Sequence, residues 1–291
     1  MQESPNIITG SLYAIVAFFC MAVFGILAKM GLESSPVVWV SFLAYLTGTL
    51  VLVPFIATYG LEYLKSEHYP FLIGRALFGT AASFLYTISI QYIPIVNGTL
   101  LFNTAPIFIP LLSIIFLKAR LEKSLWLAVL IGFIGIIIII KPTAAIFTQT
   151  GNLVGLASGM SLAIAYLLMK LLTNTDPGIR IIFYYLGIGT LVQAPLLYFA
   201  EGYPTLEGSI YAIISGLMLV IAQLALIKGY HYADASQIGV YQYSSIVFVG
   251  LIEWMFWDNV PPLSDLLGIL LVAIAGMIII RNGHKITHKA L

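Results

Sequence analysis

The chain has 291 residues, of which 60% are hydrophobic and only 9% charged, and its net charge at pH 7 is +1. Its mean hydropathy of +1.02 excludes an ordinary soluble domain, because a soluble exterior cannot carry so much apolar surface. The composition predicts an all-α protein that crosses a membrane several times. The single cysteine, Cys20, excludes an intramolecular disulfide and a cysteine-based metal site.

Apolar blocks of the length that a membrane-spanning helix needs, about 20 residues, follow one another along the whole chain. Short polar or Pro- and Gly-containing breaks separate them. In chain order the predicted spans are 8–29, 36–58, 70–90, 96–117, 124–140, 152–172, 179–199, 208–229, 236–257 and 264–281. The first block is too long for a cleavable signal and lacks a small-residue cleavage site, so we expect it to be retained as a span.

The basic residues favour ten spans with both termini in the cytoplasm. If the N-terminus is inside, the inner side collects most of the Lys and Arg residues, as the positive-inside rule requires. The inner set is Lys65, Lys118, Arg120, Lys123, Lys170, Arg180, Lys228, Arg281, Lys285 and Lys289. The outer set is Lys29 and Lys141, with the acids Glu33, Glu201, Glu207 and Asp258. A miscount by one span would scramble this separation.

The second half of the chain repeats the layout of the first. A glycine-spaced aliphatic run, Ile131–Lys141, closes the first half, and a similar run, Leu267–Arg281, closes the second. Each half holds an odd number of spans, so the halves enter the membrane in opposite senses. We therefore expect two inverted five-helix repeats, residues 1–145 and 146–291, an arrangement that supports alternating access in secondary transporters.

Arg75 lies near the cytoplasmic end of the third predicted span, with Gly79, Ser83 and Tyr86 on the same helical face. Two interpretations are open. The guanidinium could attract an anionic group or anchor an inner gate. Alternatively, it could be a snorkelling cation that reaches the inner headgroups from the first turns of its span.

The fourth predicted span carries Thr99, Asn103, Pro106 and Pro110 on one stripe. A proline frees a backbone carbonyl one turn earlier and lets the helix bend. Such irregularity inside a membrane is tolerated where it lines a cavity or packs against protein. The span is either a pathway helix with Asn103 as a hydrogen-bonding group at the midplane, or a kinked packing helix whose Asn103 bonds to a neighbour.

Glu253 is an acid inside the ninth predicted span. A carboxylate in hydrocarbon costs about 2.5–3.5 kcal/mol, so it should face the protein interior or a water-filled cavity. Helical spacing aligns it with Gln242, Ser245 and Val249 on one face. It is either a proton-coupling acid or counter-charge for a cationic substrate, or one half of a structural ion pair with Lys29.

Aromatic and polar side chains surround this acid in the sequence. Tyr241, Gln242, Tyr243 and Ser245 lie at mid-depth of the span, and Trp254 follows Glu253 directly. Aromatic walls with a few convergent polar groups are typical of a small-molecule pocket. The pattern is compatible with a cationic or aromatic solute, through cation–π contact or stacking. Tyrosines that pack without a binding role are the alternative.

These segments together resemble the drug/metabolite transporter superfamily of ten-helix EamA-domain proteins. The resemblance covers essentially the whole chain and rests on Arg75, on the runs Ile88–Leu121 and Trp126–Pro142, and on Gly229–Pro261 with the glycine-containing run that follows. It implies a fold in which spans three, four, eight and nine, with the inner ends of spans one and six, surround a central cavity. Members are mostly exporters or exchangers of small metabolites without an ATPase domain.

The chain departs from the family pattern at two turns. Family members usually carry a Glu just after spans four and nine, and this chain has Ala119 and Asn259 at those positions. The resemblance therefore assigns those two residues no role.

We expect a secondary transporter of the bacterial inner membrane, not an enzyme, that exports or exchanges a small metabolite. An amino acid, a purine-like or S-adenosylmethionine-like compound and an organic amine all fit. The expected energy source is a proton gradient or substrate exchange, and the expected partners are the solute, the lipid bilayer and protons. We expect no cofactor, no metal and no nucleic acid, and a monomer or weak dimer.

Three other classes compete with this interpretation. A passive channel or facilitator of the same architecture is the main alternative. A membrane-embedded enzyme would need catalytic acids, histidines or metal ligands at the membrane surface, where the loops are short and poor in them. A purely structural subunit would not need polar stripes inside several spans.

Overall fold

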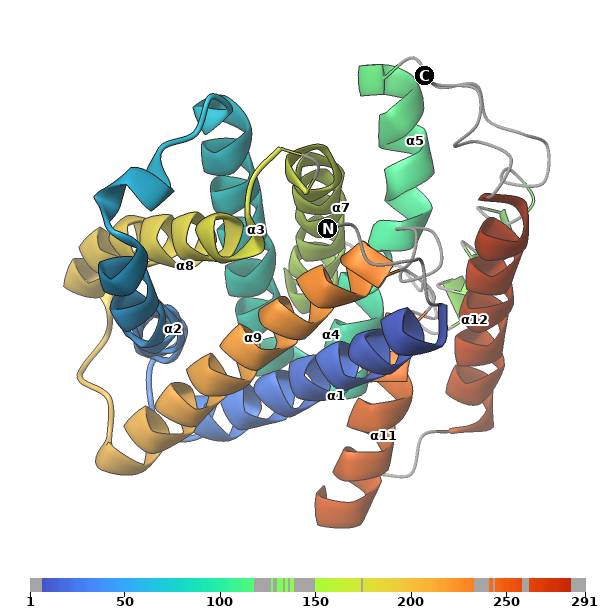
Figure 1. Cartoon of the computed structure of the whole chain (residues 1–291). Helices are drawn as coiled ribbons and strands as arrows, with labels where there is room; N and C mark the ends of the chain where they lie inside the picture. Colours follow the sequence, from blue (N-terminus) through green and yellow to red (C-terminus); the bar gives the residue numbers. More distant parts are fainter. Residues whose placement is uncertain are drawn as a thin grey trace.

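The computed structural model describes residues 7–117, 150–173, 175–232, 241–242, 244–257 and 262–283, together with several positions between 127 and 138. The regular elements in these residues are all helical, which confirms the predicted all-α class for this part of the chain. The elements are α1 (Ile7–Leu32), α2 (Val37–Tyr59), η1 (Leu61–Leu64), α3 (Tyr69–Tyr92), α4 (Ile95–Phe102), α5 (Ala105–Leu117), α7 (Thr150–Leu172), α8 (Gly178–Gln193), η3 (Ala194–Phe199), α9 (Leu206–Tyr232), α11 (Ser244–Trp257) and α12 (Leu263–Gly283) (Figure 1).

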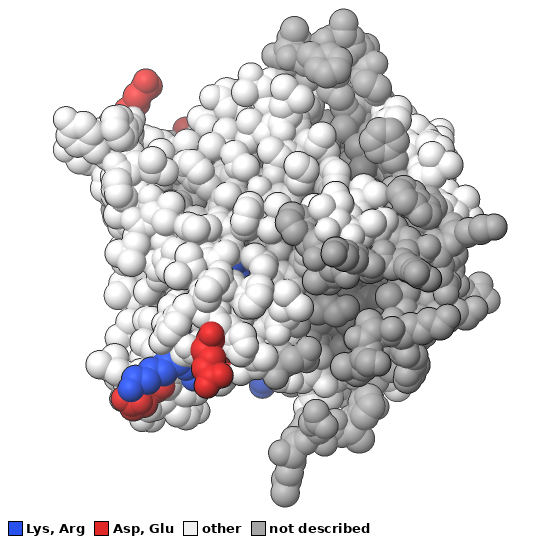
Figure 2. All heavy atoms as spheres, turned by 90° about the horizontal axis from the view of Figure 1, so that it is seen from above, with Lys and Arg blue, Asp and Glu red and all other residues white. Residues whose placement is uncertain are grey.

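Six helical segments among the described residues are long and apolar enough to cross a membrane. They are α1, α2, α3, α7, α8 with η3, and α9, and they match the predicted spans one to three and six to eight. The 23 residues of α2 rise about 34 Å, which suffices for a hydrocarbon core of about 30 Å. Most of the described surface in the view of Figure 2 is uncharged, with charged side chains in only a few spots. The protein is therefore a multi-pass membrane protein.

Prolines set the starts of several helices. Pro36, Pro94 and Pro177 precede α2, α4 and α8 and have extended ψ values of 142°, 141° and 141°. Proline fixes φ near −65° and has no N–H to leave unsatisfied, so it ends the preceding loop without disturbing the new helix. These are the breaks at which the sequence predicts span boundaries.

Three predicted spans differ from continuous helices. The fourth, 96–117, is two helices, α4 and α5, with a turn at Asn103 and Thr104. The seventh, 179–199, ends in the 3-10 helix η3, which begins at Ala194 and Pro195, because Pro195 cannot donate an α-helical hydrogen bond. The described part of the ninth begins its helix at Ser244, and residues 233–240 lie outside the described residues, as does most of the fifth span.

The helices pack as pairs that come from different halves of the chain. The two most extensive contacts are α1 along α9 and α3 along α7, and both pairs lie side by side in Figure 1. Glycines allow close approach: a Cβ on Gly216 of α9 would overlap the Ala44 carbonyl of α2, and a Cβ on Gly159 of α7 would overlap the Leu101 carbonyl of α4. The halves thus interdigitate.

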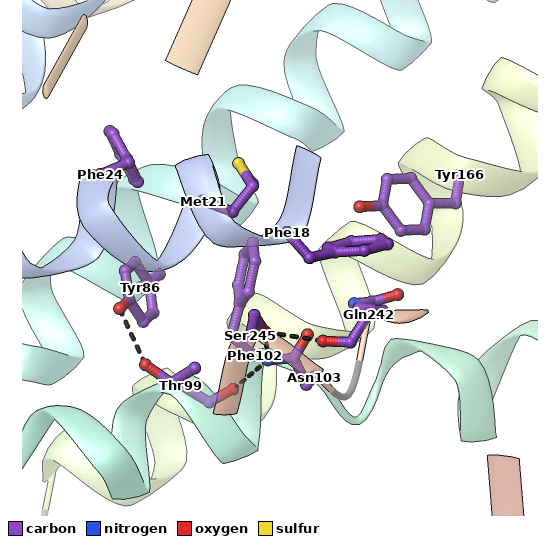
Figure 3. Close-up of a pocket in the computed structure, with 10 residues that line it drawn as sticks. All are labelled: Phe18, Met21, Phe24, Tyr86, Thr99, Phe102, Asn103, Tyr166, Gln242 and Ser245. Carbon is purple, nitrogen blue, oxygen red and sulfur yellow. Dashed lines mark hydrogen bonds between the residues drawn. The ribbon is translucent and has the colours of Figure 1, made fainter. Parts of the chain in front are cut away.

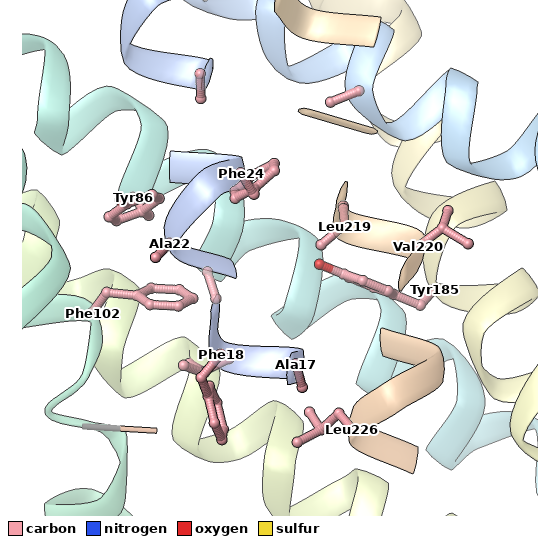
Figure 4. Packing of buried hydrophobic residues seen from close by; sticks show 14 of the residues in the cluster. Ala17, Phe18, Ala22, Phe24, Tyr86, Phe102, Tyr185, Leu219, Val220 and Leu226 are labelled. Atoms are coloured by element: carbon pink, nitrogen blue, oxygen red, sulfur yellow. The ribbon is translucent and has the colours of Figure 1, made fainter. Parts of the chain in front are cut away.

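One face of helix α1 lies in the apolar core. Figure 4 shows its side chains between those of α3 and α4 on one side and those of α8 and α9 on the other. The labelled residues are Ala17, Phe18, Ala22 and Phe24 of α1, Tyr86 and Phe102 of α3 and α4, and Tyr185, Leu219, Val220 and Leu226 of α8 and α9. The other face of α1 is exposed but equally apolar, with Leu12, Val16 and Phe19 at 60%, 47% and 45% exposure, which explains why no polar face is legible in its sequence.

The loop after α1 and the loop before α9 are joined by neutral hydrogen bonds, here named the Ser35 cluster. The hydroxyl of Ser35 accepts the Thr205 backbone N–H at 3.0 Å, and Thr205 Oγ1 donates to Ser34 Oγ at 2.9 Å. Trp39 Nε1 donates to the Gly202 carbonyl at 3.1 Å. This cluster lies where α2 begins.

A charged cluster, here named the Asp176 cluster, lies where α2 ends. Arg180 Nη1 donates to Asp176 Oδ1 at 2.8 Å, and its Nε donates to the Tyr63 carbonyl at 2.6 Å. His68 Nδ1 lies 3.7 Å from Asp176 Oδ2. Burial raises the pKa of the Asp176 carboxyl, but hydrogen bonds from Arg180, Ser66 and Thr175 outweigh it and hold that pKa below its usual value.

Candidate functional site

A small cavity lies at the centre of the bundle, where α1 faces the break between α4 and α5. Its walls are mainly aromatic, and neutral polar groups gather on one side (Figure 3). The lining residues are Phe18, Met21, Phe24, Tyr86, Thr99, Phe102, Asn103, Tyr166, Gln242 and Ser245. They come from α1, α3, α4, α7 and the start of α11, so both halves of the chain contribute.

The break in the fourth span places Asn103 at this cavity. Asn103 ends the first half of the span by donating from Nδ2 to the Thr99 carbonyl at 2.9 Å, while Thr104 Oγ1 donates to the Leu101 carbonyl at 2.7 Å. Pro106 has no N–H to donate to the Phe102 carbonyl four residues earlier. The side chains of Asn103 and Thr104 reinforce the turn by adding second hydrogen bonds to carbonyls that already accept the backbone N–H groups of the same two residues. The predicted bend of this span is confirmed.

Neutral hydrogen bonds join the two halves across the cavity. Asn103 Nδ2 also donates to Ser245 Oγ at 2.9 Å, and Ser245 Oγ donates to the Gln242 carbonyl at 2.7 Å. Tyr86 Oη and Thr99 Oγ1 lie 3.0 Å apart. The buried Nε2 of Gln242 has no hydrogen-bond partner among the described residues. One amide donor therefore remains available to a solute.

The structure brings together half of the residues that the sequence singles out for binding. Tyr86, Asn103, Gln242 and Ser245 line the cavity. Tyr241 lies beside them, and its Oη donates to Ser11 Oγ of α1 at 2.7 Å. Gln242, Ser245 and Val249, which are expected on one face with Glu253, are all buried.

Two predicted residues stand outside the described residues. Tyr243 is one of them, and the side chain of Glu253 is the other, although α11 includes position 253. Both interpretations of Glu253, a coupling acid or an ion pair with Lys29, therefore stay predictions. Lys29 donates from Nζ to the Ile90 carbonyl of α3.

Trp254 does not line the cavity. Its side chain is 51% exposed, whereas Ser245 and Val249 on the inward face of α11 are buried. Position 254 follows Val249 by more than one turn of 3.6 residues, which rotates its side chain away from that face. Trp254 is therefore not among the residues that line this cavity.

The position of Arg75 excludes the snorkelling interpretation, because only 2% of this residue is exposed. The guanidinium stacks on the Tyr185 ring at 4.2 Å from its centroid, and Nη2 donates to Gln223 Oε1 of α9 at 3.3 Å. Tyr185 Oη in turn contacts Tyr45 Oη at 2.6 Å and Ser83 Oγ at 3.0 Å. We name these residues, Tyr45, Arg75, Ser83, Tyr185 and Gln223, the Arg75 cluster.

The helices around the cavity differ in one respect from the expected set. The family resemblance implies that span eight, which is α9, lines the central cavity. In the structure α9 supplies none of the lining residues and instead contacts Arg75 through Gln223. The aromatic side chains of α1 take that place. Sequence reasoning missed Phe18, Met21 and Phe24 because apolar residues cover all faces of α1 and give no signal of direction.

The described residues hold no group of three His, Cys, Asp or Glu side chains at metal-binding distance. The described lining of the central cavity carries no charged side chain. Its chemistry is therefore aromatic and apolar contact with a few hydrogen bonds, which suits recognition of a ring or a flat apolar group.

Comparison with known proteins agrees with this architecture. The model of the EamA-like transporter family matches the chain twice, over residues 8–141 and 149–281. The pseudopaline exporter of Pseudomonas aeruginosa (strain UCBPP-PA14) is 27% identical over 268 residues, covering 92% of this chain and 94% of the relative. The S-adenosylmethionine uptake transporter of Rickettsia bellii is 26% identical over 258 residues, covering 87% of this chain and 86% of the relative.

Two further similarities extend over nearly the full length. The riboflavin transporter of Vibrio cholerae is 25% identical over 285 residues and 94% of each chain. A solved crystal structure superposes with a TM-score of 0.71 at 17% identity, covering 93% of this chain and 96% of the other, which shows a shared fold. With a family model that matches both halves, the chain belongs to the EamA-like transporter family.

Proposed function

We propose that this protein is a secondary transporter that moves a small metabolite across the bacterial inner membrane by alternating access through the central cavity. The observation that carries the proposal is the cavity itself, which lies at a broken helix and is lined by both halves of the chain. Broken helices that meet between two repeats are where transporters of this kind hold their solutes.

We further propose ten spans in two inverted repeats, residues 1–145 and 146–291, with both termini in the cytoplasm. The double match of the family model supports this division. The contact pattern supports it too. In the proposed repeats α1 corresponds to α7 and α3 corresponds to α9, so the α1–α9 contact in one arrangement corresponds to the α7–α3 contact in the other, and these are the two most extensive helix contacts. Tyr45 and Tyr185, which are equivalent when Tyr92 is aligned with Tyr232, meet each other through their hydroxyls.

In this proposal the two ends of the bundle open alternately. The Ser35 cluster closes the outer end and the Asp176 cluster closes the inner end. Each joins loops from different halves of the chain, so each must separate when its end opens. The direction of transport is export or exchange, and the driving force is a proton gradient or the gradient of a second solute.

The topology can be tested with the single native cysteine replaced. On a Cys20→Ser background, Lys65→Cys should be protected from a membrane-impermeant maleimide in intact cells, whereas Glu201→Cys should react. The two positions flank the clusters at opposite ends of α2, so labelling of both from the same side would contradict the proposed topology. Reactivity of Lys65→Cys after permeabilisation serves as the control.

Transport is tested by counterflow in proteoliposomes that contain the full chain. A thermal-shift screen of metabolites, including riboflavin and S-adenosylmethionine, first selects the solute, since a ligand at about 100 times its Kd stabilises by roughly 2.7 kcal/mol. Vesicles preloaded with that unlabelled solute should transiently accumulate the labelled form. Equilibration without this trans-stimulation would instead indicate a passive facilitator.

A pair of variants ties transport to the cavity. Asn103→Leu removes the hydrogen bond between α4 and Ser245 and should lower counterflow about tenfold or more, as expected for the loss of one buried hydrogen bond. Trp254→Leu alters an exposed side chain and should leave counterflow unchanged. A larger loss of counterflow in Trp254→Leu than in Asn103→Leu would show that the solute does not pass through this cavity.

A further inference from the structure

Arg75 is a buried cation with no acidic partner among the described residues. A guanidinium has five N–H donors, and the one contact from Nη2 to Gln223 leaves Nε and Nη1 without partners in the described part of the chain. None of the ion pairs among the described residues includes Arg75. Buried charges in proteins are normally paired, so the site is chemically incomplete.

The surroundings of Arg75 are aromatic and polar but neutral. The Tyr185 ring lies beneath the guanidinium, and the phenols of Tyr45, Tyr166 and Tyr230 lie within electrostatic range of it. Tyr166 also lines the central cavity. The aromatic environment is therefore shared between the cavity and the Arg75 cluster, and the cluster supplies the only cation described there.

Other unsatisfied polar atoms lie along the same interface of α3 and α8. The hydroxyl Oγ1 of Thr80 and the amide Oε1 of Gln193 are both buried without a hydrogen-bond partner among the described residues. Gln193 Nε2 donates to the Gly189 carbonyl at 3.1 Å, and Thr80 Oγ1 lies against Gly189. Unpaired polar groups in the same helix interface as an unpaired cation point to a polar ligand.

We infer that Arg75 binds a carboxylate of the transported solute, an inference that rests on the transport function proposed above. A carboxylate carries one negative charge and accepts two parallel hydrogen bonds from a guanidinium. Its single negative charge is therefore balanced by Arg75 alone, and no second cation is needed at the site. A phosphate monoester carries about −1.5 to −2 at pH 7 and would need a second cation, which the described part of the Arg75 cluster does not contain.

The solute class follows from the two neighbouring environments. On α3, Tyr86 lines the central cavity and Ser83 contacts Tyr185. The backbone of Arg75 lies about 16 Å from that of Tyr86, toward the start of the helix, and its guanidinium reaches back from there to Gly79. The aromatic side chains favour a ring or another flat apolar group, and Arg75 favours an acid. The inferred substrate is a carboxylic acid with an aromatic or similar apolar body.

Gly79 gives the guanidinium its place. A Cβ at this position would overlap Arg75 Nη1 and approach Tyr185 Cε2 to 2.8 Å. Gly79→Ala therefore keeps the arginine but displaces its donors. Gly187→Ala on α8 is a matched control, because its nearest neighbour would be Thr49 Cγ2 at 4.0 Å.

Binding is measured by thermal shift on the purified full chain in detergent, over a concentration series of each probe. The acids are phenylacetate and indole-3-acetate, and their amides serve as neutral isosteres. Phenethylamine tests for a cation site and phenyl phosphate for a phosphate site. We expect the two acids to stabilise the protein and the amides and amine to have no effect.

The variants assign this binding to Arg75. Arg75→Gln should weaken acid binding about 10- to 100-fold, the range for losing a hydrogen-bonded charge. Arg75→Lys should retain part of the affinity, Gly79→Ala should lose most of it, and Gly187→Ala should match the wild type. Size-exclusion profiles and unliganded Tm values show whether each variant is folded.

Several outcomes would overturn the inference. Equal acid affinity in wild type and Arg75→Gln would remove Arg75 from the site. Equal binding of acids and amides, preference for the phosphate or the amine, or no acid binding at all would exclude a carboxylate site. Acid binding that depends on Arg75 without counterflow of the same acid would retain the site and contradict the transport function instead.

Discussion

Arg75 and Arg180 both lie over a tyrosine ring, but only Arg180 has an acidic partner among the described residues. Arg180 lies over the Tyr63 ring at 5.4 Å and Arg75 over the Tyr185 ring at 4.2 Å. Arg180 is paired with Asp176 at 2.8 Å, near the end of the bundle. Arg75 is more deeply buried, and none of its described neighbours is an acid.

The difference separates a structural charge from one available for binding. The Arg180 guanidinium ties the loop after α2 to the start of α8, and both its charge and its Nε donor are satisfied within the protein. The donors of Arg75 are not, although burial makes an unsatisfied donor more costly there. The following experiments test whether this distinction holds.

The largest effect on stability should come from breaking the satisfied pair. Asp176→Asn leaves the mostly buried Arg180 without its acid, and we expect a loss of about 2 kcal/mol, below the 3–5 kcal/mol typical of fully buried pairs. Thermal unfolding in detergent measures it. A Tm equal to that of the wild type would show that the Asp176 cluster does not hold the two loops together.

Moving the unsatisfied arginine should have a smaller effect. Gly79→Ala introduces a methyl group against Arg75 and Tyr185, and overpacking of this kind costs about 1–3 kcal/mol, partly offset by the better helix propensity of alanine. Gly187→Ala should be neutral or slightly stabilising, because it gains helix propensity in open space. Equal Tm values for the two variants would contradict the close packing around Arg75.

The two arginines should also differ in the response of stability to pH. The folded-state pKa of Asp176 is below its unfolded value, so its contribution is fully present above the unfolded pKa of about 3.9 and is lost as the pH falls through the folded pKa. His68, the other titratable group that faces Asp176, is first replaced by Asn. On that background the Tm difference between the Asp176 and Asp176→Asn proteins should be constant from pH 7 to 5 and shrink below about pH 4. A difference that grows on acidification would reverse the sign of the pKa shift.

The smallest effect should come from neutralising Arg75 in the absence of ligand. Arg75→Gln removes a buried charge, and no described acid loses its partner as a result. The free energy of unfolding should therefore stay within about 1 kcal/mol of the wild-type value or rise. Unliganded thermal unfolding measures it next to Asp176→Asn. A loss as large as that of Asp176→Asn would mean that Arg75 is structural.

Much of the fold could be predicted because its signals are local. About 20 consecutive apolar residues are enough to indicate a span, and the breaks at Pro36, Pro94 and Pro177 are visible one residue at a time. Pro106 likewise predicts the bend in the fourth span. Asn103 and Ser245 could be recognised as polar groups at mid-depth, although their sequence separation hides the hydrogen bond between them.

The face of each helix is harder to predict in a membrane than in water. Lipid and protein interior are both apolar, so a span can be hydrophobic on all sides and hydropathy does not indicate which residues point inward. Sequence proximity to Glu253 suggests Trp254 as a lining residue and gives no signal for Phe18 and Phe24, whereas the cavity is lined by Phe18 and Phe24 and not by Trp254. Only the packing of the neighbouring helices distinguishes these positions.

The sequence by itself determined that the chain spans a membrane, where six of its spans lie and which family it resembles, since each of these depends on composition and order along the chain. Tertiary structure decided which polar groups meet and which remain unsatisfied. Arg75 shows the reason. Its position in the third span is compatible with either an exposed or a buried guanidinium, and only the packing of α2, α8 and α9 around it determines that it is buried.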